Sequence, residues 1–249
     1  MTTSAHTPNA APVAVVSGGS SGIGRAFVET LLHEGYTVYA CGRDAERLAQ
    51  LAAAFPAVRT VRCDVVERQS VRAFAATVRR DHDRIDLLVS NAGGSREVDL
   101  TTLDACFDLT REIRVNYEGA VNLIAEFLPA LRTGAPSRLI IVGSGYGLVP
   151  SPRTPLYSAS KAALHSLALT LRRTLAPLNI SVTEVCPPVV DTPSVEHRSV
   201  SKMRPQDVVA QTLAGARKGR ATVYPGKARF LPLLNRLSPA LAQRIVARS

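Results

Sequence analysis

The chain has 249 residues, 46% of them hydrophobic and 20% charged, so it can bury a substantial core as one large domain or two small ones. No apolar run approaches the ~20 residues of a membrane-spanning helix. The four cysteines form no C-x-x-C pair, so neither a zinc site nor a disulfide framework is indicated. The formal net charge is +10, but few aromatic residues interleave with the bases, so no nucleic acid is expected as a partner. We expect a cytoplasmic protein with reduced thiols, no metal and a disordered lead-in over residues 1–11.

Short runs of β-branched residues alternate along the chain with Ala/Leu/Arg stretches of helical length. This alternation predicts a parallel sheet with helices on both faces, and the right-handed crossover rule favours a single-domain, doubly wound, Rossmann-type α/β fold of about seven strands over residues 12–249. In chain order we expect a strand at 13–17, a helix to about 33, a strand at 37–41, a helix at 44–55, a strand at 58–65, a helix at 67–81, a strand at 85–93, a helix at 104–132, a strand at 137–144, a helix at 157–175, a strand at 181–188, a helix at 204–219 and a short strand at 221–226.

A serine- and glycine-rich segment, SGGSSGIG at 17–24, directly follows the first expected strand. Glycines at this point allow a tight turn and let the backbone approach a pyrophosphate, which then meets a helix N-terminus. Because ligands of such sheets bind at the carboxyl ends of the strands, the segment predicts a dinucleotide site. The expected contacts from it are Ser17, Gly18, Ser20, Ser21, Gly22, Ile23 and Gly24.

The residue after the second strand should select between NAD and NADP. An acid there would bind the ribose hydroxyls, whereas an arginine accommodates a 2′-phosphate. This chain has Gly42 at the tip and Arg43 next, while Asp44 is expected to cap the following helix. Since a guanidinium suits a phosphate in charge and fork geometry, we predict that NADP(H) is preferred over NAD(H).

Two further strand ends carry polar or small residues that fit the same ligand. The third strand ends in CDV, where Asp64 could accept a hydrogen bond from the adenine amino group and Val65 lies alongside. The fourth ends in NAG, so that Asn91, Ala92 and Gly93 are expected to pass beneath the cofactor.

The segment YSASK, at 157–161, opens a helix and separates a phenol from an amine by four residues. Positions i and i+4 share one face of a helix, so Tyr157 and Lys161 should point the same way. Free tyrosine has a pKa near ~10, and a neighbouring ammonium favours the phenolate. Tyr157 is therefore a candidate general acid and base, with Lys161 expected to lower its pKa.

The chain carries these motifs in order: S-G-G-S-S-G-I-G, C-D-V, S-N-A-G, V-N-Y-E-G, a serine 13 positions before the tyrosine of Y-S-A-S-K, and P-P-V-V-D-T-P. In combination they resemble the short-chain dehydrogenase/reductase superfamily over residues 13 to 193. The resemblance implies a catalytic set of Asn116, Ser144, Tyr157 and Lys161. It implies interconversion of a ketone and a secondary alcohol, with Lys161 also holding the nicotinamide ribose and Asn116 positioning a water. Contacts to the nicotinamide end are implied for Pro187, Val190 and Thr192.

Two departures from the family pattern stand out. Ser17 replaces the usual threonine, and Pro188 replaces the usual glycine after the sixth strand. Proline fixes φ and lacks an N–H, so the loop that carries Val190 and Thr192 could follow a different path. The double proline is similar to 3-ketodihydrosphingosine reductases, so ketosphingoid reduction stands beside β-ketoacyl or polyketide ketoreduction as the specific activity. A non-catalytic NADP-binding sensor or scaffold is the alternative from another class.

Substrate is expected over Tyr157, bounded by segments 94–98, 145–156 and 193–204, with residues 190–249 as substrate lid and basic C-terminal extension. The helix that begins near Tyr157 is apolar over most of its circumference, which predicts a homodimer or homotetramer. Residues 227–249 are basic and amphipathic in places. They could lie on an anionic membrane, but packing over the protein's own pocket or interface is favoured.

Overall fold

A computed structural model describes residues 11–101, 110–133, 136–193 and 201–247. Parts of the expected 104–132 helix and of the 193–204 segment, most of the lead-in, and Cys106, lie outside these residues. The strands are β1 (Val13–Ser17), β2 (Thr37–Gly42), β3 (Arg59–Arg62), β4 (Leu87–Ser90), β5 (Ser137–Val142), β6 (Ile180–Val185) and β7 (Thr222–Val223). The helices are α1 (Gly22–His33), α2 (Ala45–Ala54), α3 (Arg68–Asp81), α4 (Arg111–Ile113), α5 (Gly119–Arg132), α6 (Pro155–Leu175), α7 (Pro205–Arg217), α8 (Leu231–Leu237) and α9 (Pro239–Ala247).

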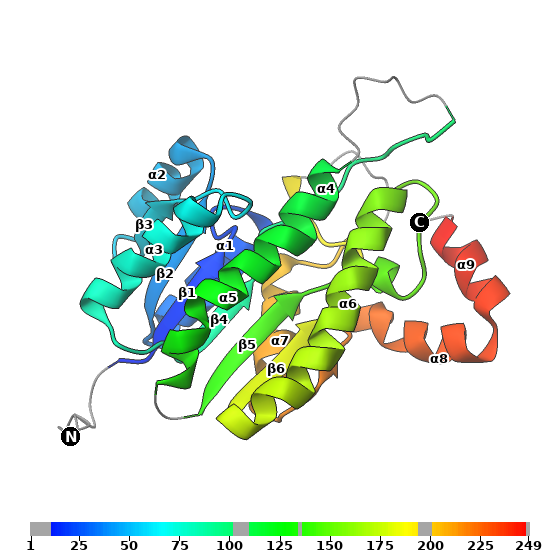
Figure 1. Cartoon of the computed structure of the whole chain (residues 1–249). Coiled ribbons are helices and arrows are strands. Elements are labelled where there is room, and N and C mark those ends of the chain that lie inside the picture. The colour runs from blue at the N-terminus through cyan, green and yellow to red at the C-terminus, as the bar shows by residue number, and fades with distance from the viewer. Residues whose placement is uncertain (1–10, 102–109, 134–135, 194–200, 248–249) are drawn as a thin grey trace.

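The seven strands form one parallel sheet in the order β3-β2-β1-β4-β5-β6-β7, which confirms the Rossmann-type fold (Figure 1). The order reverses between β1 and β4, and a doubly wound sheet places its ligand crevice at that point. The strands read as continuous apolar runs because both faces are covered: all five residues of β1 are buried. Two large apolar clusters lie on opposite faces of the sheet. One packs against α3, α5 and α6, and the other against α1, α2 and α7.

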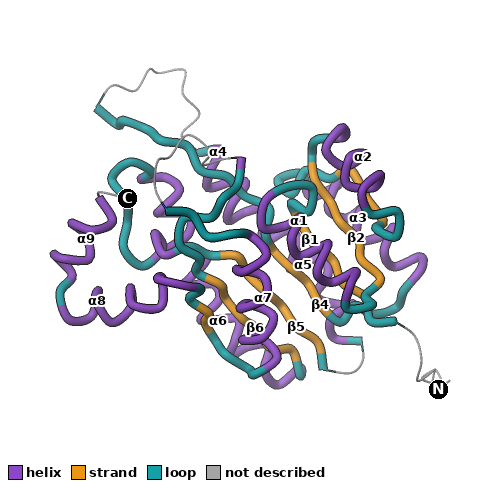
Figure 2. Tube along the Cα trace, turned by 180° about the vertical axis from the view of Figure 1, so that it is seen from behind, coloured by secondary structure: helices purple, strands orange, loops and turns teal. Residues whose placement is uncertain are grey.

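Several boundaries differ from expectation. The third and fourth strands are shorter than expected, and the expected long helix is divided in its described part. Between α4 and α5 the turns of Arg114–Glu118 widen to π-helical hydrogen bonding, a local insertion often found at functional sites. Two short helices, α8 and α9, follow the sheet and pack together at one end of the molecule (Figures 1 and 2). No helix in the described residues is long and apolar enough to cross a membrane.

Candidate active site

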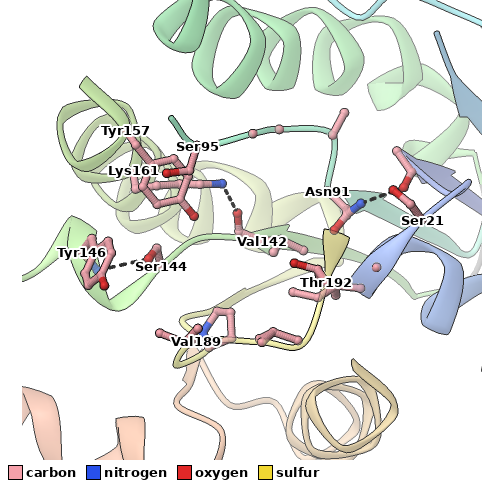
Figure 3. A pocket seen from close by; sticks show the side chains of 18 of the residues that line it. Ser21, Asn91, Ser95, Val142, Ser144, Tyr146, Tyr157, Lys161, Val189 and Thr192 are labelled. Atoms are coloured by element: carbon pink, nitrogen blue, oxygen red, sulfur yellow. Dashed lines mark hydrogen bonds between the residues drawn. The ribbon is translucent and has the colours of Figure 1, made fainter. Parts of the chain in front are cut away.

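A cavity of about 780 Å³ lies where the glycine-rich turn, the ends of β2 to β6 and helices α8 and α9 meet. Most residues predicted from the sequence line it, and Figure 3 shows several of them. They are Gly18, Ser20, Ser21, Gly22, Ile23, Arg43, Val65, Asn91, Ala92, Gly93, Ser144, Tyr157, Lys161, Pro187, Val190 and Thr192. Four other predicted residues, Ser17, Gly24, Asp64 and Asn116, are not part of the lining.

The turn between β1 and α1 requires its glycines. Gly18 and Gly22 have φ values of +64° and +52°, a backbone region that favours glycine. A Cβ on Gly24 would come within 2.1 Å of the Gly18 carbonyl oxygen, so the helix can start this close to the turn only without a side chain there. The side chain of Ser21, at the N-cap of α1, forms no capping bond. The first-turn N–H groups therefore suit a phosphate, and the segment fits a dinucleotide.

Ser17, the last residue of β1, links this turn to the end of β4. Its hydroxyl oxygen accepts hydrogen bonds from the N–H groups of Asn91 and Ala92, at 2.9 and 3.0 Å. The Asn91 side-chain amide in turn donates to the Ser17 carbonyl at 2.9 Å. These bonds join the ends of β1 and β4. Ser17 therefore supplies the hydroxyl that joins the two strand ends.

At the end of β2, Arg43 lines the cavity and its side chain is 51% exposed. Its guanidinium lies 3.9 Å from the Asp64 carboxylate, which also accepts a hydrogen bond from the Val66 N–H. Asp64 thus fixes its own turn and adjoins Arg43 rather than lining the cavity. Asp44 caps α2 as expected, accepting a bond from the Arg47 N–H at 3.0 Å. Arg47, which also lines the cavity, was not anticipated.

Asn116 sits in the π-helical turn and is fully buried. Its side chain exchanges hydrogen bonds with both backbone groups of Gly94, at 2.9 and 3.0 Å, and donates to the Ser160 hydroxyl at 2.9 Å. The amide therefore ties the segment after β4 to α6 instead of projecting into the cavity.

Ser144, Tyr157 and Lys161 come together in the cavity (Figure 3). The helical spacing predicted this for Tyr157 and Lys161, and the family resemblance implied it for Ser144. The Lys161 ammonium lies 5.5 Å from the centre of the Tyr157 ring and donates to the Val142 carbonyl at 2.8 Å. Burial raises the pKa of Tyr157 to about 12, and the largest opposing effect is its hydrogen bond with Ser144. Burial also lowers the pKa of Lys161 to about 8. In the chain without coenzyme, Ser144 therefore does more than Lys161 to favour the phenolate, which differs from expectation.

A buried carboxylate behind Lys161 was not anticipated. Glu184 on β6 is fully buried, and its Oε2 lies 2.7 Å from Nδ1 of His165 and 3.8 Å from the Arg172 guanidinium. Burial lowers the pKa of Lys161, and the negative charge of Glu184 raises it and so opposes part of that effect. Together with burial, it raises the pKa of the neighbouring Cys186 thiol. The sequence signal was a lone acid inside an otherwise uncharged strand, ISVTEV.

The loop after β6 faces the cavity despite its two prolines. Both Pro188 and Val190 line the cavity. Hydrogen bonds at 2.9 Å link the Met203 N–H to Val189 and the Asp191 N–H to Met203, so the segment is held like a short strand. Thr192 lies close to Gly22: a Cβ added to Gly22 would come within 2.9 Å of the Thr192 methyl group.

The C-terminal helices form the remaining wall. A small apolar cluster centred on Val149, Ala242 and Val246 packs α8 and α9 against the loop after β5. The cavity-lining residues from this region are Lys227, Ala228, Phe230, Leu231, Leu234, Ile245 and Val246. Their amphipathic spacing was visible in the sequence, but which face would meet the cavity was not.

The fold and this cavity define a nicotinamide-dependent oxidoreductase of the Rossmann type. The sequence model of the short chain dehydrogenase family matches residues 12–202, and the chain belongs to that family. An uncharacterized oxidoreductase of Bacillus subtilis, DltE, is 36% identical over 179 residues, covering 72% of this chain and 71% of that protein. The NADPH-dependent 1-acyldihydroxyacetone phosphate reductase of Saccharomyces cerevisiae is 34% identical, covering 68% of this chain and 58% of the yeast protein. A short chain dehydrogenase from Burkholderia cenocepacia, solved with NADP, superimposes with a TM-score of 0.85 at 28% identity over 95% of this chain and 97% of that one.

Proposed function

We propose that the protein is an NADPH-dependent oxidoreductase that interconverts a ketone and a secondary alcohol in the cytoplasm. It would act as a single catalytic domain, with residues 190–249 as substrate lid and basic C-terminal extension. The observation that carries this proposal is the meeting of Ser144, Tyr157 and Lys161 in one cavity with the glycine-rich turn. NADPH, when bound, supplies the hydride. The turn before α1 would hold its pyrophosphate and Arg43 its 2′-phosphate.

The chain's own residues manage the proton. Tyr157 donates its phenolic proton to the carbonyl oxygen of the substrate during reduction and takes it back during oxidation. Ser144 hydrogen-bonds the same oxygen and stabilises its developing negative charge. Lys161 supplies positive charge beside Tyr157, and the buried Glu184 helps keep that lysine protonated. Asn116 holds the segment after β4 against α6, which fixes the floor of the site.

The cavity wall contributed by α8 supports an apolar substrate. Phe230, Leu231 and Leu234 line the cavity, and Lys227 adds a cation. Leu231 and Leu234 belong to the same apolar cluster as Tyr146, whose ring contacts that of Tyr157. The similarity to the yeast reductase of an acylated ketone phosphate supports a long-chain ketone with an anionic group. Ketosphingoid, β-ketoacyl and polyketide ketones remain the candidates to be assayed. Pro188 is the one sequence feature that favours a non-catalytic sensor or scaffold, and the loop that carries it lines the cavity.

The proposed assembly is a homodimer or homotetramer through α6. Leu169 on that helix is 48% exposed and is a side chain that a second copy would cover. Light scattering should give a mass above the 26.6 kDa of one chain, and a monomer would contradict the assembly without affecting the proposed chemistry.

The test of the reaction is a panel of long- and short-chain ketones and alcohols, assayed with NADPH and NADP by the absorbance of the reduced nicotinamide. Tyr157→Phe should lower turnover by roughly a hundredfold or more while NADPH binding, measured by fluorescence, is kept. Tyr117→Phe, on the same chain but outside the cavity lining, is the matched control. Full turnover of the folded Tyr157→Phe protein would overturn the mechanism.

A further inference from the structure

Exposed apolar side chains gather on and beside α8 and α9. Five of the ten large apolar side chains that are exposed in the described part of the chain lie between residues 230 and 245. We name these five the outer stripe: Phe230, Leu233, Leu237, Leu241 and Ile245, with exposed fractions between 47% and 74%. Concentrated exposure of this kind on a soluble fold marks an interaction surface.

Within each helix, the residues of the stripe lie on one face. Leu233 and Leu237 are four residues apart on α8, and Leu241 and Ile245 are four apart on α9, so each pair shares one helix face. The contacts between α8 and α9 keep the two faces in one compact unit at the end of the molecule (Figures 1 and 2). The stripe is therefore a surface of the folded protein rather than a frayed end.

The charge around the stripe identifies the occupant. No aspartate or glutamate follows Asp207 in the sequence. Within the described residues the stripe is bordered by Arg236 and Arg244 on the helices, and by Arg229, whose guanidinium lies 4.7 Å from the Phe230 ring centre. A second copy docked through this surface would bring its own bases against these, which like-charge repulsion opposes. Apolar side chains among uncompensated bases instead complement a lipid surface with anionic head groups.

The stripe also coincides with the mouth of the cavity. Phe230 and Ile245 belong to the stripe and line the cavity as well, while their neighbours Leu231, Leu234 and Val246 continue the apolar wall inward. An acyl chain could thus pass from a bilayer to the wall beside Tyr157 without crossing water. The two earlier options for the tail, packing over the pocket and lying on a membrane, are therefore compatible, because the same helices supply side chains to both surfaces.

We propose that α8 and α9 dock the protein peripherally on an anionic membrane, and that a membrane-dissolved long-chain ketone enters the cavity through the outer stripe. The docking stands by itself, whereas the entry of substrate rests on the proposed ketone reduction. Leu233 and Leu237 serve for the test because they belong to the stripe but do not line the cavity.

The experiment sediments the full chain with vesicles of phosphatidylcholine alone and with vesicles of equal amounts of phosphatidylcholine and phosphatidylglycerol. The wild type should pellet with the anionic vesicles and largely stay in solution with the neutral ones. The double variant Leu233→Ser, Leu237→Ser should bind roughly tenfold more weakly, because two apolar side chains no longer leave water. The control double variant Leu100→Ser, Leu178→Ser alters exposed apolar residues elsewhere and should bind like the wild type.

Activity gives the second readout. The stripe variant should keep wild-type turnover of a short, water-soluble ketone but lose roughly tenfold on a long-chain ketone presented in anionic vesicles. Absence of wild-type binding, equal binding to neutral vesicles, or unchanged binding of the stripe variant would each overturn the docking. If the stripe variant binds vesicles like the wild type but has a smaller particle mass in light scattering, the surface contacts a second copy instead. Vesicle binding without reduction of any ketone would overturn the proposed function and leave the docking in place.

Discussion

Replacing Lys161 with methionine is expected to stabilise the coenzyme-free fold at neutral pH while abolishing turnover. Burial lowers the pKa of this lysine from 10.5 to about 8, so the folded state carries its charge at a cost. At about 1.4 kcal/mol per pH unit, the lowering corresponds to about 3 kcal/mol. Methionine also forfeits the hydrogen bond to the Val142 carbonyl, worth about 1 kcal/mol, which leaves a net gain of about 2 kcal/mol.

The pH dependence tests the cause. Below about pH 8 the lysine is protonated in both the folded and the unfolded wild type, so the cost is present in full. Between about 8 and 10.5 the folded state releases the proton while the unfolded state keeps it, and the stability of the wild type therefore rises with pH. The advantage of the methionine variant should shrink across that window.

Urea unfolding of the coenzyme-free proteins near pH 7 and near pH 10 measures both effects. Lys218→Met, which changes an exposed lysine after α7, is the matched control and should leave the free energy of unfolding nearly unchanged at both values. The reasoning fails if Lys161→Met is less stable than the wild type near neutral pH, or if its advantage is the same at both pH values.

Two further substitutions probe the cofactor end and the carboxylate behind the lysine. Arg43→Ala should raise the Michaelis constant for NADPH roughly 10- to 100-fold and leave that for NADH nearly unchanged, because charge-assisted hydrogen bonds of about 1.5–3 kcal/mol are lost only with the 2′-phosphate. Arg132→Ala, exposed at the end of α5, is its control, and an unaltered preference for NADPH would refute the assignment. Glu184→Gln removes a charge that raises the pKa of Lys161, so the alkaline decline of turnover in the pH–rate profile should move to lower pH. Asp207→Asn should leave that profile in place, and an unmoved profile for Glu184→Gln would show that its charge does not reach the lysine.

Much of the architecture follows from local patterns. Continuous apolar runs such as Val13–Ser17 predicted buried parallel strands because only a sheet covered on both faces can bury every residue of a strand. The four-residue spacing of Tyr157 and Lys161 predicted that they share a face, and the ammonium indeed lies over the ring. The π-helical turn at Arg114–Glu118 could not be predicted, since one inserted residue shifts the phase of the apolar pattern but leaves its 3.6-residue period unchanged.

The sequence pattern could not predict the pKa values of the side chains in the site. Spacing places an ammonium near a phenol, but the pKa of each depends on burial, and burial arises from segments distant in sequence. For the same reason the Glu184 carboxylate was overlooked, because its partners His165 and Arg172 are on another element. The tail was recognisable as amphipathic, yet only packing against Val149 decides which of its faces turns inward.

The hydroxyl of Ser17, bonded to the backbone of Asn91 and Ala92, has a thermodynamic consequence for coenzyme binding. The cradle for the phosphates is already assembled from two strand ends, so the ligand spends none of its binding energy on ordering a loop. Association then resembles docking into a preorganised receptor. Its calorimetric signature should reflect surface removed from water by the coenzyme, not the folding of the receptor around it.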